Sequence, residues 1–364
     1  MRIAQIAPTW ISIPPVGYGG VEAIISFLTE ELVKRGHEVT LFASGDSKTK
    51  ARLFPVVDKA PGLSVESMQT FSNNMEYLFN MCMAIEKEKE FDLIHWHFGM
   101  DIAPIMLKSF TQTPSVVTIH NHFSPGYMKA IDNILEYYKD TKYFVSISDA
   151  HREHFPFEFI GTVYNGINVE DYDFNKTPQK YLVWLGRFIR EKGADVAIQA
   201  ALKLGLPIKL AAPEDSNEYF LKEVKPFLGE KNVEYVGEVD FKGKNELLKN
   251  AFALLSPISW DEPFGLVVPE ANACGTPVVA YARGAMSEII KEGMNGFTAQ
   301  PDDFESLVSK IDQIVKMDEA TYLKLRESCR STALERFTIG KMVDGYEKVY
   351  QKIIEETNGK IIEG

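Results

Sequence analysis

Residues 259–277 read SWDEPFGLVVPEANACGTP, and this stretch decides how the rest of the chain is interpreted. Two glutamates, Glu262 and Glu270, stand eight residues apart with a Pro-Phe-Gly turn between them. The turn predicts a helix beginning near Leu266, and the free amides of a helix start attract anions. A solvent-exposed helix face would account for a single glutamate, but not also for the turn, the apolar helix interior and the Gly-Thr-Pro stop. We therefore expect an anion site beside carboxylates that accept hydrogen bonds from ligand hydroxyls.

Short β-rich runs alternate with helical patterns on both sides of this stretch. The alternation is typical of parallel sheets with helices on both faces, and 364 residues favour two domains. The expected strands are 2–7, 38–43, 91–95, 115–119, 143–147 and 159–163, then 181–185, 207–211, 233–236, 253–255 and 277–280. The expected helices are 20–35, 70–89, 127–139, 149–154, 193–204, 217–227, 244–250, 265–274, 285–291, 303–316, 319–335 and 340–356.

A polar segment with neither periodicity, residues 166–180, is the expected linker. The predicted fold class is α/β, with two Rossmann-like domains built on parallel sheets. The first covers residues 1–170 and the second residues 171–336, and residues 337–364 form a C-terminal helix with an apolar stripe.

Two further segments place cationic residues or glycines after a predicted strand. Gly186 and Arg187 follow one strand, and Lys192 comes five residues after the arginine. The carboxyl edge of a parallel sheet is where ligands bind, and these two cations suit a diphosphate. Gly19 and Gly20 open the first helix, where a backbone without side chains can approach a ligand closely. Solvated surface and a simple chain reversal are the alternative interpretations of these two segments.

Together these segments resemble retaining glycosyltransferases of family 4, which have the GT-B fold. The resemblance covers nearly the whole chain, and its most specific part is Glu262 to Glu270 with Phe264-Gly265-Leu266 between them. The further matching segments are 92–97 (DLIHWH), 117–121 (VTIHN), 146–149 (SISD) and 165–168 (NGIN).

The resemblance implies that the second domain holds a nucleoside-diphosphate sugar and the first an acceptor, with the active site between them and the last helix crossing back to the first domain. Arg187 and Lys192 would neutralise the diphosphate. Glu262 would bind hydroxyls of the donor sugar, and Glu270 the ribose. The other implied donor contacts are Gly19, Gly20, Gly186 and the backbone of Phe264, Gly265 and Leu266.

The resemblance also gives His120 a contact with the transferred sugar, and His95, His97 and His122 become candidates for binding the acceptor. UDP-sugars such as UDP-glucose are the favoured donors, the acceptor hydroxyl is not identified, and no metal or other cofactor is expected. The chain departs from the family pattern at residues 284–288 (GAMSE), where a proline is missing, so no catalytic role is assigned there.

Other interpretations of the same residues remain open. The pairs His95/His97 and His120/His122 could chelate zinc, and Asp171-Tyr172-Asp173 matches a short metal-binding signature. No third ligand accompanies the histidines, and in an acidic linker the aspartates are better explained as surface charge. A nucleotide-sugar epimerase and a non-catalytic nucleotide-sugar-binding partner are the alternative functions. The epimerase would need acid or base groups for elimination, whereas the binding partner would be expected to lack the cations or glutamates.

The composition excludes several classes of protein. A net charge of −12 repels nucleic acid and anionic membranes at long range. Three scattered cysteines make neither a disulfide framework nor a zinc site. The apolar run at residues 1–7 is too short for a signal peptide, and no apolar stretch reaches the length of a spanning helix. We therefore expect a cytoplasmic protein without a transmembrane segment.

Overall fold

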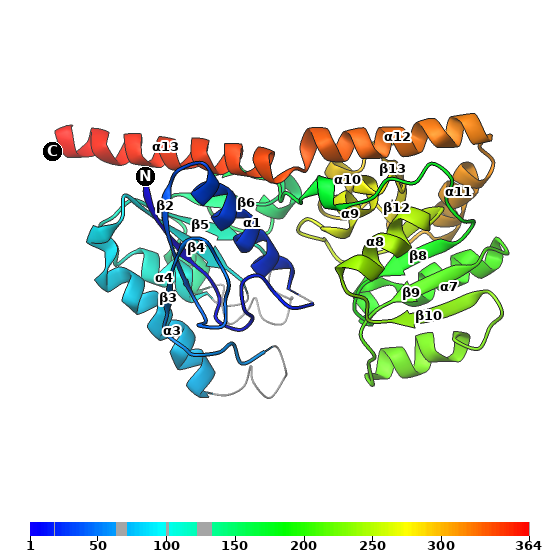
Figure 1. The fold of residues 1–364 in the computed structure, drawn as a ribbon, viewed down its shortest axis with the longest axis horizontal. Helices are drawn as coiled ribbons and strands as arrows, with labels where there is room; N and C mark the ends of the chain where they lie inside the picture. The colour runs from blue at the N-terminus through cyan, green and yellow to red at the C-terminus, as the bar shows by residue number, and fades with distance from the viewer. Residues whose placement is uncertain (18, 63–70, 100–101, 122–132, 364) are drawn as a thin grey trace. The chain divides into compact units, whose positions relative to one another are not determined.

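The computed structural model describes residues 1–363 except 18, 63–70, 100–101 and 122–132 (Figure 1). The chain divides into two compact units. Unit 1 comprises Met1–Gly166 together with Ile339–Gly364, and unit 2 comprises Ile167–Thr338. Each unit contains one sheet in which every strand pairing is parallel, so the predicted fold class of two Rossmann-like parallel-sheet domains is confirmed.

Unit 1 is built on a seven-stranded sheet in the order β3-β2-β1-β4-β5-β6-β7. Strand order reverses between β1 and β4, which is where parallel sheets place ligand-contacting loops. The strands are β1 (Arg2–Ile6), β2 (Glu38–Ala43), β3 (Arg52–Pro55), β4 (Leu93–Phe98), β5 (Ser115–Ile119), β6 (Phe144–Ser146) and β7 (Phe159–Thr162). The helices with described bounds are α1 (Gly20–Lys34), α3 (Phe71–Glu86), η1 (Glu88–Glu90), α4 (Ala103–Lys108), α6 (Asp149–Arg152) and α13 (Ile339–Glu363).

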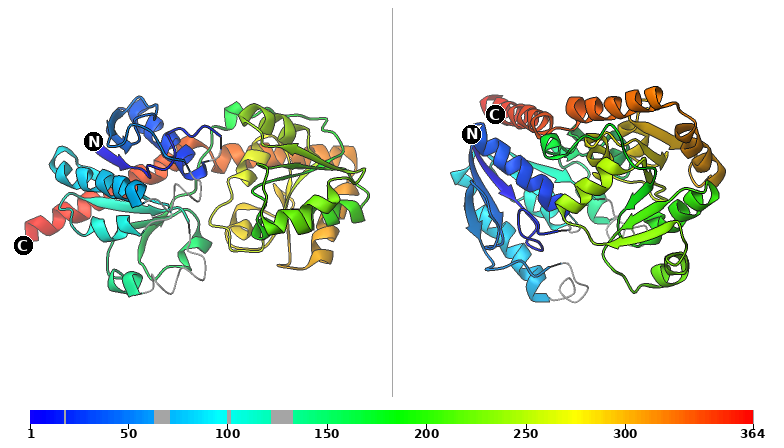
Figure 2. Two further views of the ribbon diagram at one scale, coloured as in Figure 1. Left: turned by 90° about the horizontal axis from the view of Figure 1, so that it is seen from below. Right: turned by 45° about the vertical axis from the view of Figure 1, so that its right-hand side comes forward.

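Different helices cover the two faces of the unit 1 sheet. Side chains alternate along each strand, so successive residues of β4 contact different helices. Ile94, Trp96 and Phe98 of β4 join the apolar core with residues of α3 and α4. His95 and His97 point to the opposite face, where His95 contacts Tyr346 and Tyr350 of α13. The helix α13, distant in sequence, is therefore part of the fold of unit 1 (Figures 1 and 2).

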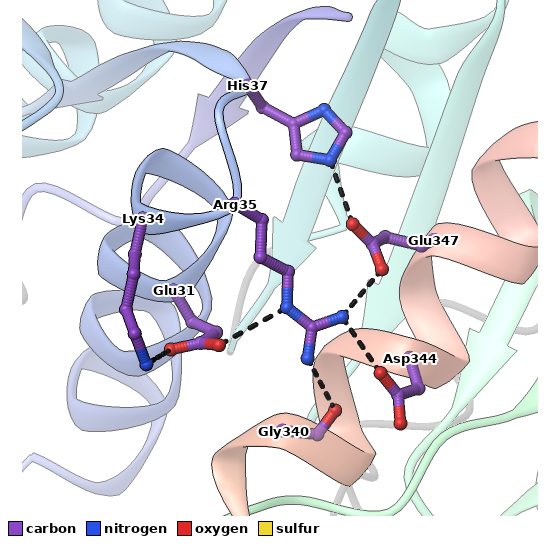
Figure 3. A network of polar contacts seen from close by, with 7 residues as sticks. All are labelled: Glu31, Lys34, Arg35, His37, Gly340, Asp344 and Glu347. Atoms are coloured by element: carbon purple, nitrogen blue, oxygen red, sulfur yellow. Dashed lines mark hydrogen bonds and ion pairs between the residues drawn. The ribbon is translucent and has the colours of Figure 1, made fainter.

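A charged cluster ties α13 to the end of α1 (Figure 3). Arg35, directly after α1, donates to Asp344 at 2.8 Å and to Glu347 at 2.6 Å. It also donates to the main-chain oxygen of Gly340 at 3.1 Å, and His37 Nε2 lies 2.9 Å from Glu347. The apolar stripe of α13 and this polar edge together hold the helix on unit 1.

Unit 2 is built on a six-stranded sheet in the order β10-β9-β8-β11-β12-β13. The strands are β8 (Leu182–Leu185), β9 (Ile208–Ala211), β10 (Val233–Gly237), β11 (Ala253–Ser256), β12 (Val278–Tyr281) and β13 (Gly296–Ala299). The helices are η2 (Val169–Asp171), η3 (Arg190–Lys192), α7 (Ala194–Lys203), η4 (Phe220–Val224), η5 (Lys225–Phe227), α8 (Phe241–Asn250), α9 (Val267–Ala273), α10 (Met286–Ile289), α11 (Phe304–Val315) and α12 (Glu319–Arg336).

The helices of unit 2 begin where the sequence supplies a capping side chain. Asp240, Asp303 and Asp318 each accept a hydrogen bond from the amide three residues on, at the starts of α8, α11 and α12. The expected helix at 217–227 is instead a π-helical turn, η4, followed by the 3₁₀ turn η5. Pro226 lacks the amide proton that a regular helix needs, which accounts for the break.

Candidate functional site

Two groups of the donor-side residues predicted from sequence lie at the switch point of the unit 2 sheet. Strand order reverses between β8 and β11, which pair directly. Gly186 and Arg187 follow β8, and the loop carrying Glu262 follows β11. Both segments leave the carboxyl ends of adjacent strands, so the topology places them at one edge of the sheet.

The carboxylate of Glu262 is held by two donors. Lys192 Nζ and Trp260 Nε1 each lie 2.6 Å from Glu262 Oε2. The Lys192 ammonium also lies 4.9 Å from the centroid of the Trp260 ring. The Lys192 and Glu262 side chains are only 20% and 12% exposed, so the ion pair is partly shielded from solvent. The structure thus brings together two predicted residues and adds Trp260, which sequence reasoning missed.

Glycines shape the backbone around Glu262. Gly265 has a φ of +80°, and a Cβ there would lie 2.5 Å from Met286 Cε. Gly284 has a φ of +52°, and a Cβ would lie 2.6 Å from both the main-chain nitrogen and oxygen of Glu262. Ala285 donates its amide to the Glu262 carbonyl at 2.9 Å. The 284–288 segment, which departs from the family pattern, therefore supports the turn that carries Glu262.

The other predicted donor contacts surround this turn. Gly186 packs on the Trp184 ring, where a Cβ would lie 3.0 Å from an aromatic carbon, and Arg187 is exposed. Phe264 is buried and meets the Phe337 ring edge-on with 6.0 Å between centroids. Leu266 stands at the N-cap of α9, as the predicted helix start requires.

A second carboxylate, that of Glu270 on α9, is also held by two donors. Glu270 Oε1 accepts from Lys244 Nζ at 2.5 Å and from the Tyr172 hydroxyl at 3.0 Å. Burial, reinforced by the neighbouring Glu270, raises the pKa of Tyr172, so the phenol stays protonated and donates. Neither Lys244 nor Tyr172 was expected at this site. Tyr172 belongs to the Asp-Tyr-Asp segment, which the sequence suggested as a site only through its two aspartates.

Asp173 of that segment makes polar contacts with α8. Asp173 is 63% exposed and pairs with Lys249 at 3.0 Å, and Asn245 Nδ2 donates to it at 3.2 Å. Across the described residues, no group of three or more His, Cys, Asp or Glu side chains is arranged to hold a metal ion.

In unit 1 the histidines form a buried network. His97 Nδ1 lies 3.0 Å from His120 Nε2, directly after β5, and the two rings stack with 5.3 Å between centroids. Burial lowers the pKa of His120 to about 3 and holds the pKa of His97 well below its usual range. His120 retains 4% exposure, whereas His97 has none.

His95 is not suited to the acceptor-binding role suggested by its sequence position. It lies inside β4 with no exposed surface. Its ring nitrogens are each 2.7 Å from a hydroxyl, one of Tyr350 and the other of Thr118. The same correction applies to His97, which bonds Gln5 and His120. His122 lies outside the described residues. Strand alternation could have indicated that both rings face a covering helix.

The glycine loop of unit 1 precedes α1. Gly19 is the N-cap residue with a φ of +155°, and a Cβ there would lie 2.6 Å from Pro15. Gly20 begins the helix. Glu22, in the first turn, is 7% exposed, and burial raises its pKa. The contact with Pro15 and the positive φ give position 19 a structural requirement for glycine that is independent of any ligand.

Two family models match the chain in succession. Residues 18–171 match the model described as Glycosyltransferase Family 4, and residues 170–336 match the model described as Glycosyl transferases group 1. N-acetyl-α-D-glucosaminyl L-malate synthase of Bacillus anthracis is 25% identical, and the alignment covers 96% of this chain and 97% of that protein.

No described helix is long and apolar enough to cross a membrane.

Solved structures share the fold over the full length. Sucrose-phosphate synthase from Thermosynechococcus elongatus superposes with a TM-score of 0.79 at 18% identity, covering 98% of this chain and 99% of that one. The Anabaena protein HepE, solved with UDP and glucose, superposes with a TM-score of 0.73 at 18% identity, covering 97% and 100%. At these identities the likeness concerns the fold.

Proposed function

The chain belongs to glycosyltransferase family 4, and from that premise we propose that it moves a sugar from a UDP-sugar to an acceptor hydroxyl, with retention at the anomeric carbon and without a metal ion. The observation that carries the proposal is the cluster of Lys192, Glu262 and Trp260 at the switch point of the unit 2 sheet. It sets a cation and a hydroxyl-binding carboxylate side by side, as the reacting end of a nucleotide-sugar requires.

Lys192 and Glu262 would exchange partners when the donor binds. A diphosphate offers Lys192 a stronger anion than one carboxylate, and sugar hydroxyls offer Glu262 donors in place of the ammonium. Trp260 Nε1 remains as a fixed donor that keeps the carboxylate oriented. The paired arrangement satisfies both charges before the donor arrives, so neither is left buried and unpaired.

The difficult step is departure of the nucleoside diphosphate. Negative charge collects on the leaving phosphate oxygen, and Lys192 and Arg187 would stabilise it electrostatically. This role of two side-chain cations is the reason for proposing that no divalent ion is needed. The acceptor hydroxyl would attack from the face that the phosphate leaves, with the phosphate taking its proton, which gives retention. His120 would contact the transferred sugar.

Glu270 would bind the ribose. Lys244 and Tyr172 hold its carboxylate in one orientation from two sides. A carboxylate fixed in this way can accept from the two ribose hydroxyls with little loss of side-chain entropy. UDP is the favoured nucleotide, supported by HepE, whose structure was solved with UDP and glucose.

A two-stage experiment tests the proposal. Thermal stabilisation of the full chain is first measured against UDP-, GDP- and ADP-sugars with excess chelator present. The best donor is then incubated with acceptor pools, and the product is examined by mass spectrometry and by the anomeric proton coupling. We expect an α-linked product from an α-linked donor without added metal. A β-linked product, a requirement for magnesium or manganese, or donor isomerisation without any acceptor product would each contradict the proposal.

A further inference from the structure

A network of buried hydrogen bonds in unit 1 ends at His120, and the residues behind His120 have no part in the transfer chemistry proposed above. Gln5 of β1 is its centre. Its Oε1 lies 2.6 Å from His97 Nε2, and its Nε2 donates to the Tyr350 hydroxyl at 3.3 Å. His97 Nδ1 in turn lies 3.0 Å from His120 Nε2. Gln5 and His97 have no exposed surface.

The chemistry of these groups fixes where each proton lies. An amide oxygen only accepts, so the bond from His97 to Gln5 requires a proton on His97 Nε2. Because burial keeps His97 neutral, its Nδ1 carries no proton and must accept from His120 Nε2. His120 is also neutral near pH 7, since burial lowers its pKa to about 3, and its Nδ1 is therefore the unprotonated nitrogen.

The hydrogen bonds on the other side of Gln5 have the same donor-to-acceptor direction. The Tyr350 hydroxyl accepts from Gln5 and donates to His95 Nδ1 at 2.7 Å. His95 Nε2 then donates to Thr118 Oγ1 at 2.7 Å, and Thr118 donates to the Tyr346 hydroxyl at 3.1 Å. Each of these bonds thus pairs one donor with one acceptor, from Thr118 of β5 to the tyrosines of α13. Turning the Gln5 amide over would reverse every bond, so this amide decides which tautomer His120 adopts.

We propose that Gln5 and His97 are positioning residues that hold His120 in its Nε2-protonated tautomer, so that Nδ1 accepts a hydrogen bond from a hydroxyl of the transferred sugar. The role at the sugar rests on the proposed function, whereas the tautomer is a property of unit 1 itself. His120 then serves as a hydrogen-bond acceptor and not as a proton source. Through Tyr350, α13 helps to fix the orientation of the Gln5 amide.

The first test reads the tautomer directly. Nitrogen NMR of the full chain labelled with ¹⁵N-histidine distinguishes protonated from bare ring nitrogens, and His120→Gln identifies the relevant signals by their loss. We expect His120 with a protonated Nε2 and a bare Nδ1 at pH 7. A protonated Nδ1, or an imidazolium with both nitrogens protonated, would overturn the proposal.

The second test compares two substitutions of His97. In His97→Asn the side-chain oxygen can replace Nδ1 as the acceptor for His120, whereas His97→Leu offers none. We expect His97→Leu to mix the two tautomers of His120 and to raise the KM for the donor about tenfold, with kcat little changed, as loss of one binding hydrogen bond does. His97→Asn should keep the tautomer and most of the affinity.

A purely structural role would give a different pattern. Partial unfolding lowers the amount of active enzyme and hence the apparent kcat, but leaves KM unchanged; that pattern, or equal defects in both variants, would overturn the proposal. His151→Leu is the matched control, because His151 is a buried histidine of unit 1 on α6 that meets Phe155 edge-on. It should leave the His120 signals unchanged, and a tautomer change there would also count against the proposal. If the parent chain transfers no sugar, the proposed function fails while the NMR result still decides the tautomer.

Discussion

Lys192 and Lys244 each pair with a glutamate of unit 2, yet we expect their replacement by methionine to change different kinetic constants. Lys192→Met removes a charge that acts on the departing diphosphate, so kcat should fall about 100-fold or more, at about 1.4 kcal/mol for each tenfold. Lys244→Met leaves the reacting bond alone and frees Glu270 from one partner. The KM for the donor should rise about tenfold while kcat changes little. Steady-state kinetics measures both constants. The same changes in kcat and KM in the two variants would show that the two lysines do not have different roles.

Gly284 and Gly293 form a second matched pair of positions. Both have a positive φ, +52° and +73°, so alanine at either costs about 1–2 kcal/mol of backbone strain. At Gly284 the added Cβ would also meet the Glu262 backbone at 2.6 Å, whereas at Gly293 it meets nothing within 4 Å. We expect Gly284→Ala to weaken donor binding at least tenfold by displacing Glu262, and Gly293→Ala only to lower the melting temperature. Calorimetric titration with the donor decides, and equal affinities in the two variants would argue against a role for Gly284.

Some site residues could be predicted from the sequence and others could not. The difference is the separation in sequence between the residues that make each contact. Glu262 and Glu270 belong to one local pattern of turn and helix, which sequence spacing displays. Lys244 reaches Glu270 from α8, 26 residues earlier, and only the packing of α8 against α9 makes that contact visible. His95 was misassigned because strand ends were estimated within a few residues, so a mid-strand position was taken for a strand end.

At the scale of elements, the strands that the sequence did not predict, β3 and β13, are short and contain no continuous run of large apolar residues. β3 reads RLFP with no fully buried residue, and β13 reads GFTA with a glycine at its start. Both lie at sheet edges, where one side of the strand has no partner. The central strands are buried on both faces and give near-continuous apolar runs, so their pattern was clear from the sequence.

The helix α12 stabilises the ends of its neighbours through a buried arginine. Arg326 has no exposed surface and donates to the carbonyls of Lys249, Ala251 and Cys274, where α8 and α9 end. A cation at helix C-termini satisfies carbonyls that have no partner within the helix.

Arg326→Met should therefore destabilise unit 2 by more than about 3 kcal/mol, because several buried carbonyls lose their donor. Urea unfolding measures the loss. Lys324→Met, at an exposed position on the same helix, is the control and should change stability by less than about 0.5 kcal/mol. A small effect at Arg326 would mean that water or other groups satisfy those carbonyls.

The two units of the whole molecule should respond differently to acid. All seven histidines of the chain lie in residues 1–166, and residues 167–338 contain none. In unit 1, burial keeps the pKa of His120 at about 3 and holds those of His95 and His97 well below their usual range.

Above pH 6.5, the ordinary histidine pKa, these rings are neutral in both the folded and the unfolded chain, and unit 1 has its full stability. Below pH 6.5 the unfolded chain binds protons that the folded unit cannot, so each histidine removes up to about 1.4 kcal/mol per pH unit, until the pH falls through its folded pKa. Hydrogen exchange measured peptide by peptide at pH 7.5, 6.5 and 5.5, corrected for the intrinsic rate, should show β4 and β5 losing protection. The strands of unit 2 serve as an internal control and should keep theirs, since the carboxylates common to both units titrate mostly below this range. Equal losses in both units would mean that the histidine network is not what makes unit 1 sensitive to acid.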